Sequence, residues 1–189
     1  MRITSKIWLI AVMVAMLTNC NLAFAQEQFP SKYYVELGSG IGLASLNDSK
    51  TNFATRDLIA SFGYDLSSKF TVRIPLALSV GLFENGKNNT SYQTNGTIGL
   101  GAGYNFIVRD DYRWQLSAEA GNTLNGKSDH WKHFYYDVSG KFYLGELGKR
   151  TNAFVGIGIR QYISGIKDSP NYLVPYLTFG FRLNHLKRK

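Results

Sequence analysis

The sequence predicts an all-β fold in which eight antiparallel strands close into an up-and-down transmembrane β-barrel. Eight runs of residues alternate large apolar side chains with small or polar ones, and each run has the length of about ten residues that a tilted strand needs to cross a membrane. Glycine is frequent on the small face, as the narrow lumen of an eight-stranded barrel requires. The connections alternate between short and long, as periplasmic turns and external loops do.

The expected strands follow one another in order. The first alternates Tyr, Val, Leu and Ile with Glu and Gly, and the second alternates Leu, Ala, Phe and Tyr with Asp, Ser and Gly. The third, TVRIPLALSVGL, has Val, Ile or Leu at every even position from 72 to 82, and the fourth opposes Ile, Leu, Tyr and Phe to three glycines. The fifth opposes Trp and Leu to Arg, Gln and Glu, and the sixth opposes Phe, Tyr and Val to Asp, Ser and Lys. The seventh sets Val and Ile against Gly and Arg, and the eighth sets Leu and Phe against Thr, Gly and Arg. The eight runs span residues 32–44, 57–66, 71–82, 97–106, 112–121, 134–144, 152–160 and 173–183.

An N-terminal segment, residues 1–25, has the features of a cleavable signal peptide. Arg2 and Lys6 precede an apolar core at 7–17, and small residues at 23 and 25 form the cleavage site. The core is shorter than the roughly 20 residues of a spanning helix. Cleavage leaves residues 26–189, and it removes two of the 21 Lys and Arg but none of the 13 acids, so the net charge falls from +8 to +6.

The only cysteine, Cys20, lies inside this leader. The mature chain therefore has neither a disulfide framework nor a thiolate metal site. A lipidated Cys20 is an alternative interpretation of the leader, although Asn19 stands where a lipoprotein signal usually has a small residue. A basic chain could bind nucleic acid, but export favours anionic lipid or lipopolysaccharide phosphate as the partner. We expect no nucleic-acid partner, no metal and no cofactor.

The direction of the apolar faces separates a membrane barrel from a soluble one. A soluble sandwich or a lipocalin-like barrel would bury these faces and expose the opposite ones to water. The opposite faces carry many glycines and few Lys or Glu, so they suit a narrow lumen better than a solvated surface. We therefore expect the apolar faces to contact lipid.

Aromatic residues and connection lengths indicate two membrane interfaces. At one set of strand ends, the expected girdle consists of Tyr64, Phe70, Tyr104, Phe106, Tyr112, Trp114, Phe142, Phe179 and Phe181. At the other, it consists of Tyr92, Trp131, Tyr136, Tyr162 and Tyr172. The short connections at the first end are 66–69, 107–111 and 145–150, and the longer ones at the second are 45–52, 83–94, 122–131 and 163–172.

The signal peptide, the eight amphipathic runs and the closing segment YLTFGFRL resemble the small outer-membrane β-barrel proteins of Gram-negative bacteria, of the OmpX, OmpA-transmembrane-domain and opacity-protein kind. The resemblance implies a multi-pass protein of the cell outer membrane, surrounded by lipid and lipopolysaccharide, and we expect a monomer. It also implies that the barrel-insertion machinery reads an aromatic residue in the last strand. Phe179 and Phe181 can supply that signal, although the short basic tail NHLKRK follows them.

Charged residues on the inward faces are the candidate site, because an isolated charge in a narrow lumen is costly and acids and bases there should pair. Counted from the short turns, they fall into a lower and an upper layer. The lower layer holds Glu36, Arg73 and Lys141, and the upper layer holds Asp57, Glu119, Asp137 and Arg160. The layers predict a lumen plugged by ion pairs, and a gated or leaky ion path built from the same residues is the alternative. Pro75 fits poorly in a paired strand and predicts a bulge.

The longer loops offer a second set of candidates. Their lysines could contact lipopolysaccharide phosphates or be solvated loop charge: Lys50, Lys87, Lys127, Lys132 and Lys167. Ser128, Asp129 and His130, with His133 nearby, could serve a lipid A-modifying enzyme, but sequence neighbours rarely reach the geometry of a catalytic triad. We therefore expect no enzyme. The predicted role is structural or a surface contact, with a small channel or a lipid A-modifying enzyme as alternatives.

Overall fold

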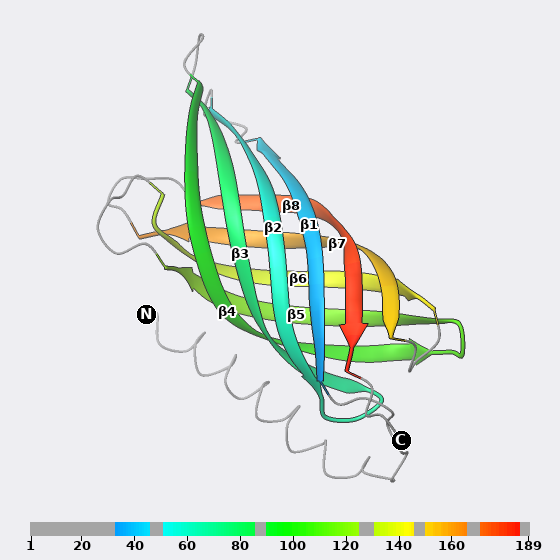
Figure 1. Cartoon of the computed structure of the whole chain (residues 1–189). Helices are drawn as coiled ribbons and strands as arrows, with labels where there is room; N and C mark the ends of the chain where they lie inside the picture. Colours follow the sequence, from blue (N-terminus) through cyan, green and yellow to red (C-terminus); the bar gives the residue numbers. More distant parts are fainter. Residues whose placement is uncertain are drawn as a thin grey trace, which may run out of the picture.

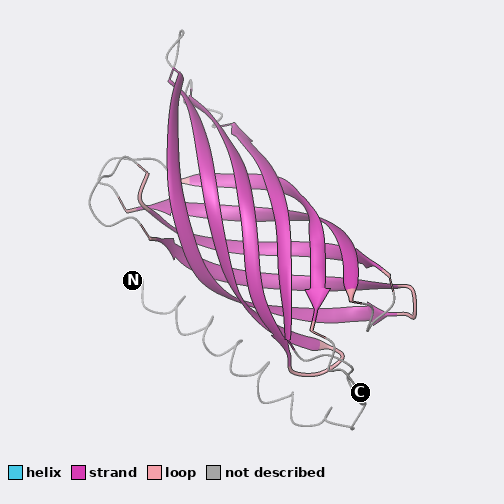
Figure 2. Ribbon diagram, viewed as in Figure 1, coloured by secondary structure: helices cyan, strands magenta, loops and turns pink. Residues whose placement is uncertain are grey.

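The computed structural model describes residues 33–45, 51–85, 90–124, 131–145, 150–165 and 171–185, and it forms one closed barrel (Figures 1 and 2). The strands are β1 (Tyr33–Ser45), β2 (Thr51–Asp65), β3 (Phe70–Asn85), β4 (Thr90–Val108), β5 (Tyr112–Thr123), β6 (His133–Leu144), β7 (Thr151–Ser164) and β8 (Tyr172–Asn184). Each strand pairs antiparallel with the next in sequence, and β8 pairs with β1. The predicted fold class is confirmed. The predicted signal peptide lies outside the described residues.

In the described part of the chain, no helix is long and apolar enough to cross a bilayer.

The outer surface of the barrel is apolar and the inside is polar. Leu58, Leu100 and Ile157 on the outer face expose 60%, 70% and 65% of their surface, whereas Glu36 and Arg73 inside expose 2% each. Water-soluble proteins bury large apolar residues and expose charged ones. The reversed arrangement is that of an outer-membrane-type barrel, in which lipid-facing and lumen-facing residues alternate.

Several strands are longer than the sequence predicts on the side of the longer connections, which we call the loop side. β2 starts at Thr51, β3 continues to Asn85 and β4 starts at Thr90, and the loop-side ends of β3 and β4 project beyond their neighbours (Figure 1). The register continues through these parts, with Thr51 opposite Asn85. Of these parts, residues 51–52, 83–85 and 90–94 were expected in polar loops, whereas the hydrogen-bond ladder depends on the backbone.

The bulge predicted at Pro75 is wrong. Pro75 is opposite Ser61 of β2 in an unbroken register, and the pairing with β4 is interrupted beside it but resumes at Leu76 in the same register. Proline lacks the N–H that a ladder needs, so the strand loses a local pairing without gaining a residue. Between the described strands, the one register shift is that between Asn105 and Ile107 of β4, opposite β5.

Most exterior aromatic pairs gather at the end with the short connections, which we call the turn side, and one pair, Phe134 and Tyr136, is at the opposite end of β6. Tyr33 and Tyr64 have ring centroids 4.9 Å apart, and Trp114 and Phe142 have centroids 4.8 Å apart. These rings cover the outer face near one membrane interface, as an aromatic girdle does.

At the loop side, the predicted girdle is wrong for Trp131, Tyr162 and Tyr172. These side chains are buried inside the barrel at 9%, 3% and 6% exposure, whereas Tyr92 and Tyr136 do face outward. The reason is strand parity, because successive side chains point to opposite faces. Tyr162 is two residues from the inward Arg160 and therefore points inward as well.

Candidate functional site: the barrel lumen

The inward faces of all eight strands bring charged side chains from distant parts of the sequence into one narrow space. In the described lumen, five acids and five bases are buried or nearly so, and their formal charges therefore balance. They are Glu36, Asp57, Asp65, Glu119 and Asp137, and Arg73, Arg113, Lys141, Arg160 and Arg182. Buried charges are tolerated in proteins where they pair and where hydrogen bonds satisfy them.

Glu36 of β1 is the centre of the turn-side half. Lys141 of β6 donates a hydrogen bond to Oε2 at 2.9 Å, and the Tyr143 hydroxyl donates to Oε1 at 2.6 Å. Arg73 and Arg182 lie within 3.7 and 4.0 Å of the same carboxylate. One acid therefore faces three cations that come from three other strands.

Arg73 of β3 connects Glu36 to a second acid. Its Nε donates to Glu119 Oε1 at 2.5 Å, and its Nη1 donates to Gln115 at 3.3 Å. Gln115 in turn donates to Asn105 at 2.9 Å. Arg73 thus joins β1, β3 and β5 across the lumen.

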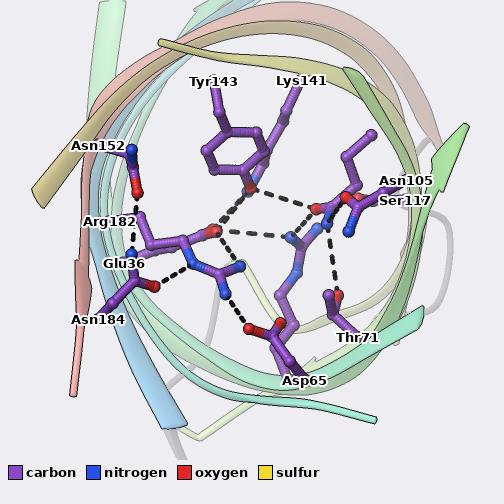
Figure 3. Close-up of polar contacts among 12 residues, drawn as sticks. Glu36, Asp65, Thr71, Asn105, Ser117, Lys141, Tyr143, Asn152, Arg182 and Asn184 are labelled. Atoms are coloured by element: carbon purple, nitrogen blue, oxygen red, sulfur yellow. Dashed lines mark hydrogen bonds and ion pairs between the residues drawn. The ribbon is translucent and has the colours of Figure 1, made fainter. Parts of the chain in front are cut away.

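Arg182 of β8 closes the turn-side end, where Figure 3 shows the labelled side chains converging from the barrel wall. Its Nη2 is 2.5 Å from Asp65 Oδ2, and its Nε donates to Asn184 at 2.8 Å. The guanidinium also lies 3.5 Å from the centre of the Tyr34 ring. Stacking and a charged hydrogen bond together hold this arginine in a defined position.

Arg160 of β7 organises the second charged group, nearer the loop side. Its Nε and Nη1 donate to Asp137 and Asp57, each at 3.0 Å. The Tyr176 hydroxyl donates to the other oxygen of Asp137 at 2.8 Å, and the guanidinium lies 4.9 Å from the centre of the Tyr135 ring. This group links β2, β6, β7 and β8.

A small cavity of about 20 Å³ lies between the two charged groups, lined among others by Glu36, Lys141, Glu119 and Arg160. A single water molecule needs a cavity of about 10–15 Å³. This cavity therefore has room for one water molecule and is too small for a continuous water column.

Aromatic side chains fill the lumen on the loop side of Arg160. Phe53 is at the centre of this cluster, stacked on Tyr172 with centroids 4.3 Å apart and edge-on to Trp131 and Tyr162 at 5.6 and 5.8 Å. We call it the aromatic cap, and its members are Phe53, Trp131, Tyr135, Tyr162, Tyr172 and Val174. Such edge-to-face and offset contacts are the favoured geometries of aromatic rings.

The predicted lumen residues all face inward, and the structure divides them into two groups. The turn-side group contains Glu36, Arg73, Glu119 and Lys141. The group nearer the loop side contains Asp57, Asp137 and Arg160. Glu119 was expected in the upper layer. Its register partner on β6 is Asp137. It nevertheless bonds to Arg73, whose side chain extends to it from the turn side.

Sequence reasoning missed Asp65, Arg113 and Arg182, although all three are on the faces that it placed inward. It also missed the uncharged partners Tyr143 and Gln115. Face parity alone could have found Asp65, Arg113, Gln115 and Tyr143, because each is an even number of residues from a predicted lumen residue on the same strand. Arg182 could have been found because it directly follows the outward Phe181 on β8.

The other predicted residues are placed as follows. Lys132 is exposed on the loop side, and Phe179 and Phe181 face outward on β8 with 55% and 57% exposure. Outside the described residues lie Lys50, Lys87, Lys127, Lys167, Ser128, Asp129 and His130.

His133 was expected at the external rim. It is buried in the lumen at 2% exposure, and its Nδ1 is 3.5 Å from Asn95 Nδ2. Among the described residues, no group of three or more His, Cys, Asp or Glu could hold a metal ion.

Comparison with known proteins gives matches at the level of structure. No protein-family model matches the sequence, and no curated protein matches it either. Neisserial surface protein A (NspA) matches with a TM-score of 0.55 and 17% identity over 81% of this chain and 97% of that chain. The N-terminal β-barrel domain of OprF from Pseudomonas aeruginosa has a TM-score of 0.44 and 18% identity over 82% of this chain and all of that domain.

The fold is that of the small outer-membrane β-barrels. The predicted resemblance is thereby confirmed as a resemblance of fold. An outer-membrane β-barrel crosses its membrane with every strand, so this chain is a multi-pass membrane protein of that kind.

Proposed function

We propose that the protein has a structural and surface-contact role in the Gram-negative outer membrane, and that its lumen is closed to ions. The supporting observation is the cross-lumen bonding of the buried charges. Glu36 with Lys141, Arg73 with Glu119, Arg182 with Asp65, and Arg160 with both Asp57 and Asp137 are all joined at 3.0 Å or less.

A permeating ion would have to separate these pairs in a low-dielectric space. Removing one partner from a buried pair is strongly unfavourable because the other charge remains uncompensated. The aromatic cap adds a layer of apolar side chains on the loop side, and a hydrophobic constriction opposes the passage of water and ions. The two barriers act in series.

The surface-contact role belongs to the loop side. We assign lipopolysaccharide phosphate contacts to Lys132, which is exposed, and to the four predicted loop lysines beyond the described residues. The signal peptide at 1–25 and the insertion signal at Phe179 and Phe181 are part of the same proposal. Both outward phenylalanines are accessible on the last strand.

Planar-bilayer recording of the refolded mature chain tests the closed lumen. We expect no channel openings from the wild type at neutral pH. A variant with Glu36→Ser, Lys141→Ser, Arg160→Ser and Phe53→Ser should conduct, because it removes the central side chains of both charged groups and of the aromatic cap. The control is Leu58→Ala, which alters only the lipid face and should stay silent. Regular openings of the wild type would overturn the proposal.

A small ion-conducting channel is the second candidate. The observation that favours it is the position of Glu36 between Lys141 at 2.9 Å and Arg73 at 3.7 Å, beside the internal cavity. If the Glu36 carboxylate moved from Lys141 to Arg73, the charges that line this cavity would be rearranged. The bilayer recording that tests the closed lumen also decides this alternative.

A lipid A-modifying enzyme receives no support from the described residues. His133 points into the lumen, between Asn95 and the Tyr162 ring, whose centroid is 4.6 Å away. A base for an outer-leaflet substrate would have to reach the outer surface, since proton transfer requires hydrogen-bond distance.

A further inference from the structure

Arg56 is a charged side chain on the lipid-facing surface of the barrel. It is exposed on the outer face of β2, which also carries Leu58, Phe62 and Tyr64. Its register neighbours on both sides are apolar, Ile41 of β1 and Val80 of β3. Arg56 makes no hydrogen bond or ion pair with another described residue, in contrast to the paired charges of the lumen.

The height of Arg56 in the membrane follows from the strand geometry. Arg56 is eight residues from Tyr64, an aromatic residue of the turn-side girdle on the same face of β2. Eight residues of a strand that is tilted by about 40° rise roughly 20 Å, and the apolar band of such barrels is about 25 Å tall. Arg56 therefore lies near the loop-side boundary of the hydrocarbon, away from its centre.

A second strand marks the same boundary. On β5, Asn122 is exposed eight residues from the outward Trp114, which belongs to the turn-side girdle. Polar outward residues thus begin at the same distance from the girdle on two strands. At this depth a guanidinium meets lipid headgroups, and its planar donors match phosphate oxygens in a bidentate geometry.

We propose that Arg56 binds a phosphate group of an outer-leaflet lipid A molecule from the side of the barrel. Thr94 of β4 is in the same register row, beyond Val80. It is exposed and about 10 Å from Arg56, so that one headgroup spans both side chains. Leu58, the next outward residue of β2 toward the turn side, faces the acyl chains. The inference extends the proposed function and depends on its placement of the protein in the outer membrane.

Native mass spectrometry of the full mature chain in detergent micelles tests this site. The probes are bisphosphorylated lipid A and the same lipid without its phosphates. We expect Arg56→Gln to bind bisphosphorylated lipid A about fivefold more weakly than the wild type, as loss of one basic residue at a membrane surface implies. Arg56→Lys should bind with an intermediate affinity. Dephosphorylated lipid A should bind equally to all three proteins.

The matched control is Arg109→Gln, which removes an exposed arginine at the turn side and should leave the affinity unchanged. The inference is overturned if Arg56→Gln and the wild type bind bisphosphorylated lipid A equally well. It is also overturned if Arg109→Gln loses as much affinity as Arg56→Gln, or if Arg56→Gln loses the same affinity for dephosphorylated lipid A. Heat-modifiable gel migration and bilayer recording on the same samples separate the two proposals. A folded, silent barrel without the Arg56 effect contradicts only this inference, whereas a conducting barrel with the effect contradicts only the closed lumen.

Discussion

The two ends of the lumen are filled by different chemistry. On the turn side, Glu36, Arg73 and Arg182 belong to a continuous set of ion pairs and hydrogen bonds whose charged members come from six strands, β1, β2, β3, β5, β6 and β8. On the loop side, Phe53 and Trp131 belong to the aromatic cap, whose contacts are between rings. Arg160 lies between the two, paired with acids and flanked by tyrosine rings.

The difference shows that charge and shape specify a lumen in different ways. A charged network requires each particular partner, because a missing partner leaves a buried charge. A packed apolar cluster tolerates exchanges that preserve volume. The turn-side half should therefore respond sharply to single substitutions, and the loop-side half should respond weakly to conservative ones.

The largest effect is expected for Glu36→Ala. The substitution leaves Lys141, Arg73 and Arg182 with one uncompensated positive charge and removes the acceptor of Tyr143. We expect the free energy of unfolding to fall by about 4 kcal/mol, as for other broken buried pairs. Urea titration of the barrel in lipid vesicles, followed by tryptophan fluorescence, measures this change.

The control for Glu36→Ala is Asp110→Ala, which removes an exposed acid in a turn-side connection. Surface substitutions of this kind change stability by about 0.5 kcal/mol or less. If the two variants were equally stable, the lumen charges would contribute no more than surface charges do.

An intermediate effect is expected for Arg160→Met, which should lower the free energy of unfolding by about 3 kcal/mol. Methionine fills much of the volume of arginine, but Asp57 and Asp137 lose their shared cation. The triple variant Arg160→Met, Asp57→Asn, Asp137→Asn removes the uncompensated charge and should recover most of the loss. The same urea titration compares the two variants, and a triple variant less stable than the single one would contradict a charge-based explanation.

The fold could be predicted from the sequence because strand parity is a local property. In the third run, apolar residues at alternate positions already separate the lipid face from the lumen face, and Arg73 follows as an inward charge. The same parity would have placed Tyr162 inside. That inference was missed because a tyrosine at a strand end also fits an interfacial girdle.

The contacts inside the lumen could be predicted only in part. Which charges meet depends on the stagger between tilted strands, and this register is not local. Counting from the turns brought Glu36 close to Lys141, but it separated Glu119 from Arg73, which bonds to it. The two residues were expected in different layers of the lumen, but the side chain of Arg73 is long enough to connect them. This reach cannot be inferred from the positions of the residues along their strands.

The smallest effect is expected in the aromatic cap, for Phe53→Leu. Phe53 is 1% exposed and contacts the rings of Phe83, Trp131, Tyr162 and Tyr172, so leucine loses ring contacts but keeps an apolar filling. We expect a loss of about 1 kcal/mol in the urea titration. The matched control is Phe62→Leu on the lipid face, where the ring is 54% exposed and lipid can fill the space, so the stability should hardly change. If Phe53→Leu lowered the free energy of unfolding as much as Glu36→Ala does, the aromatic cap would be as sensitive to substitution as the charged network. The packing of the rings would then determine the structure of the lumen as strictly as the pairing of charges does.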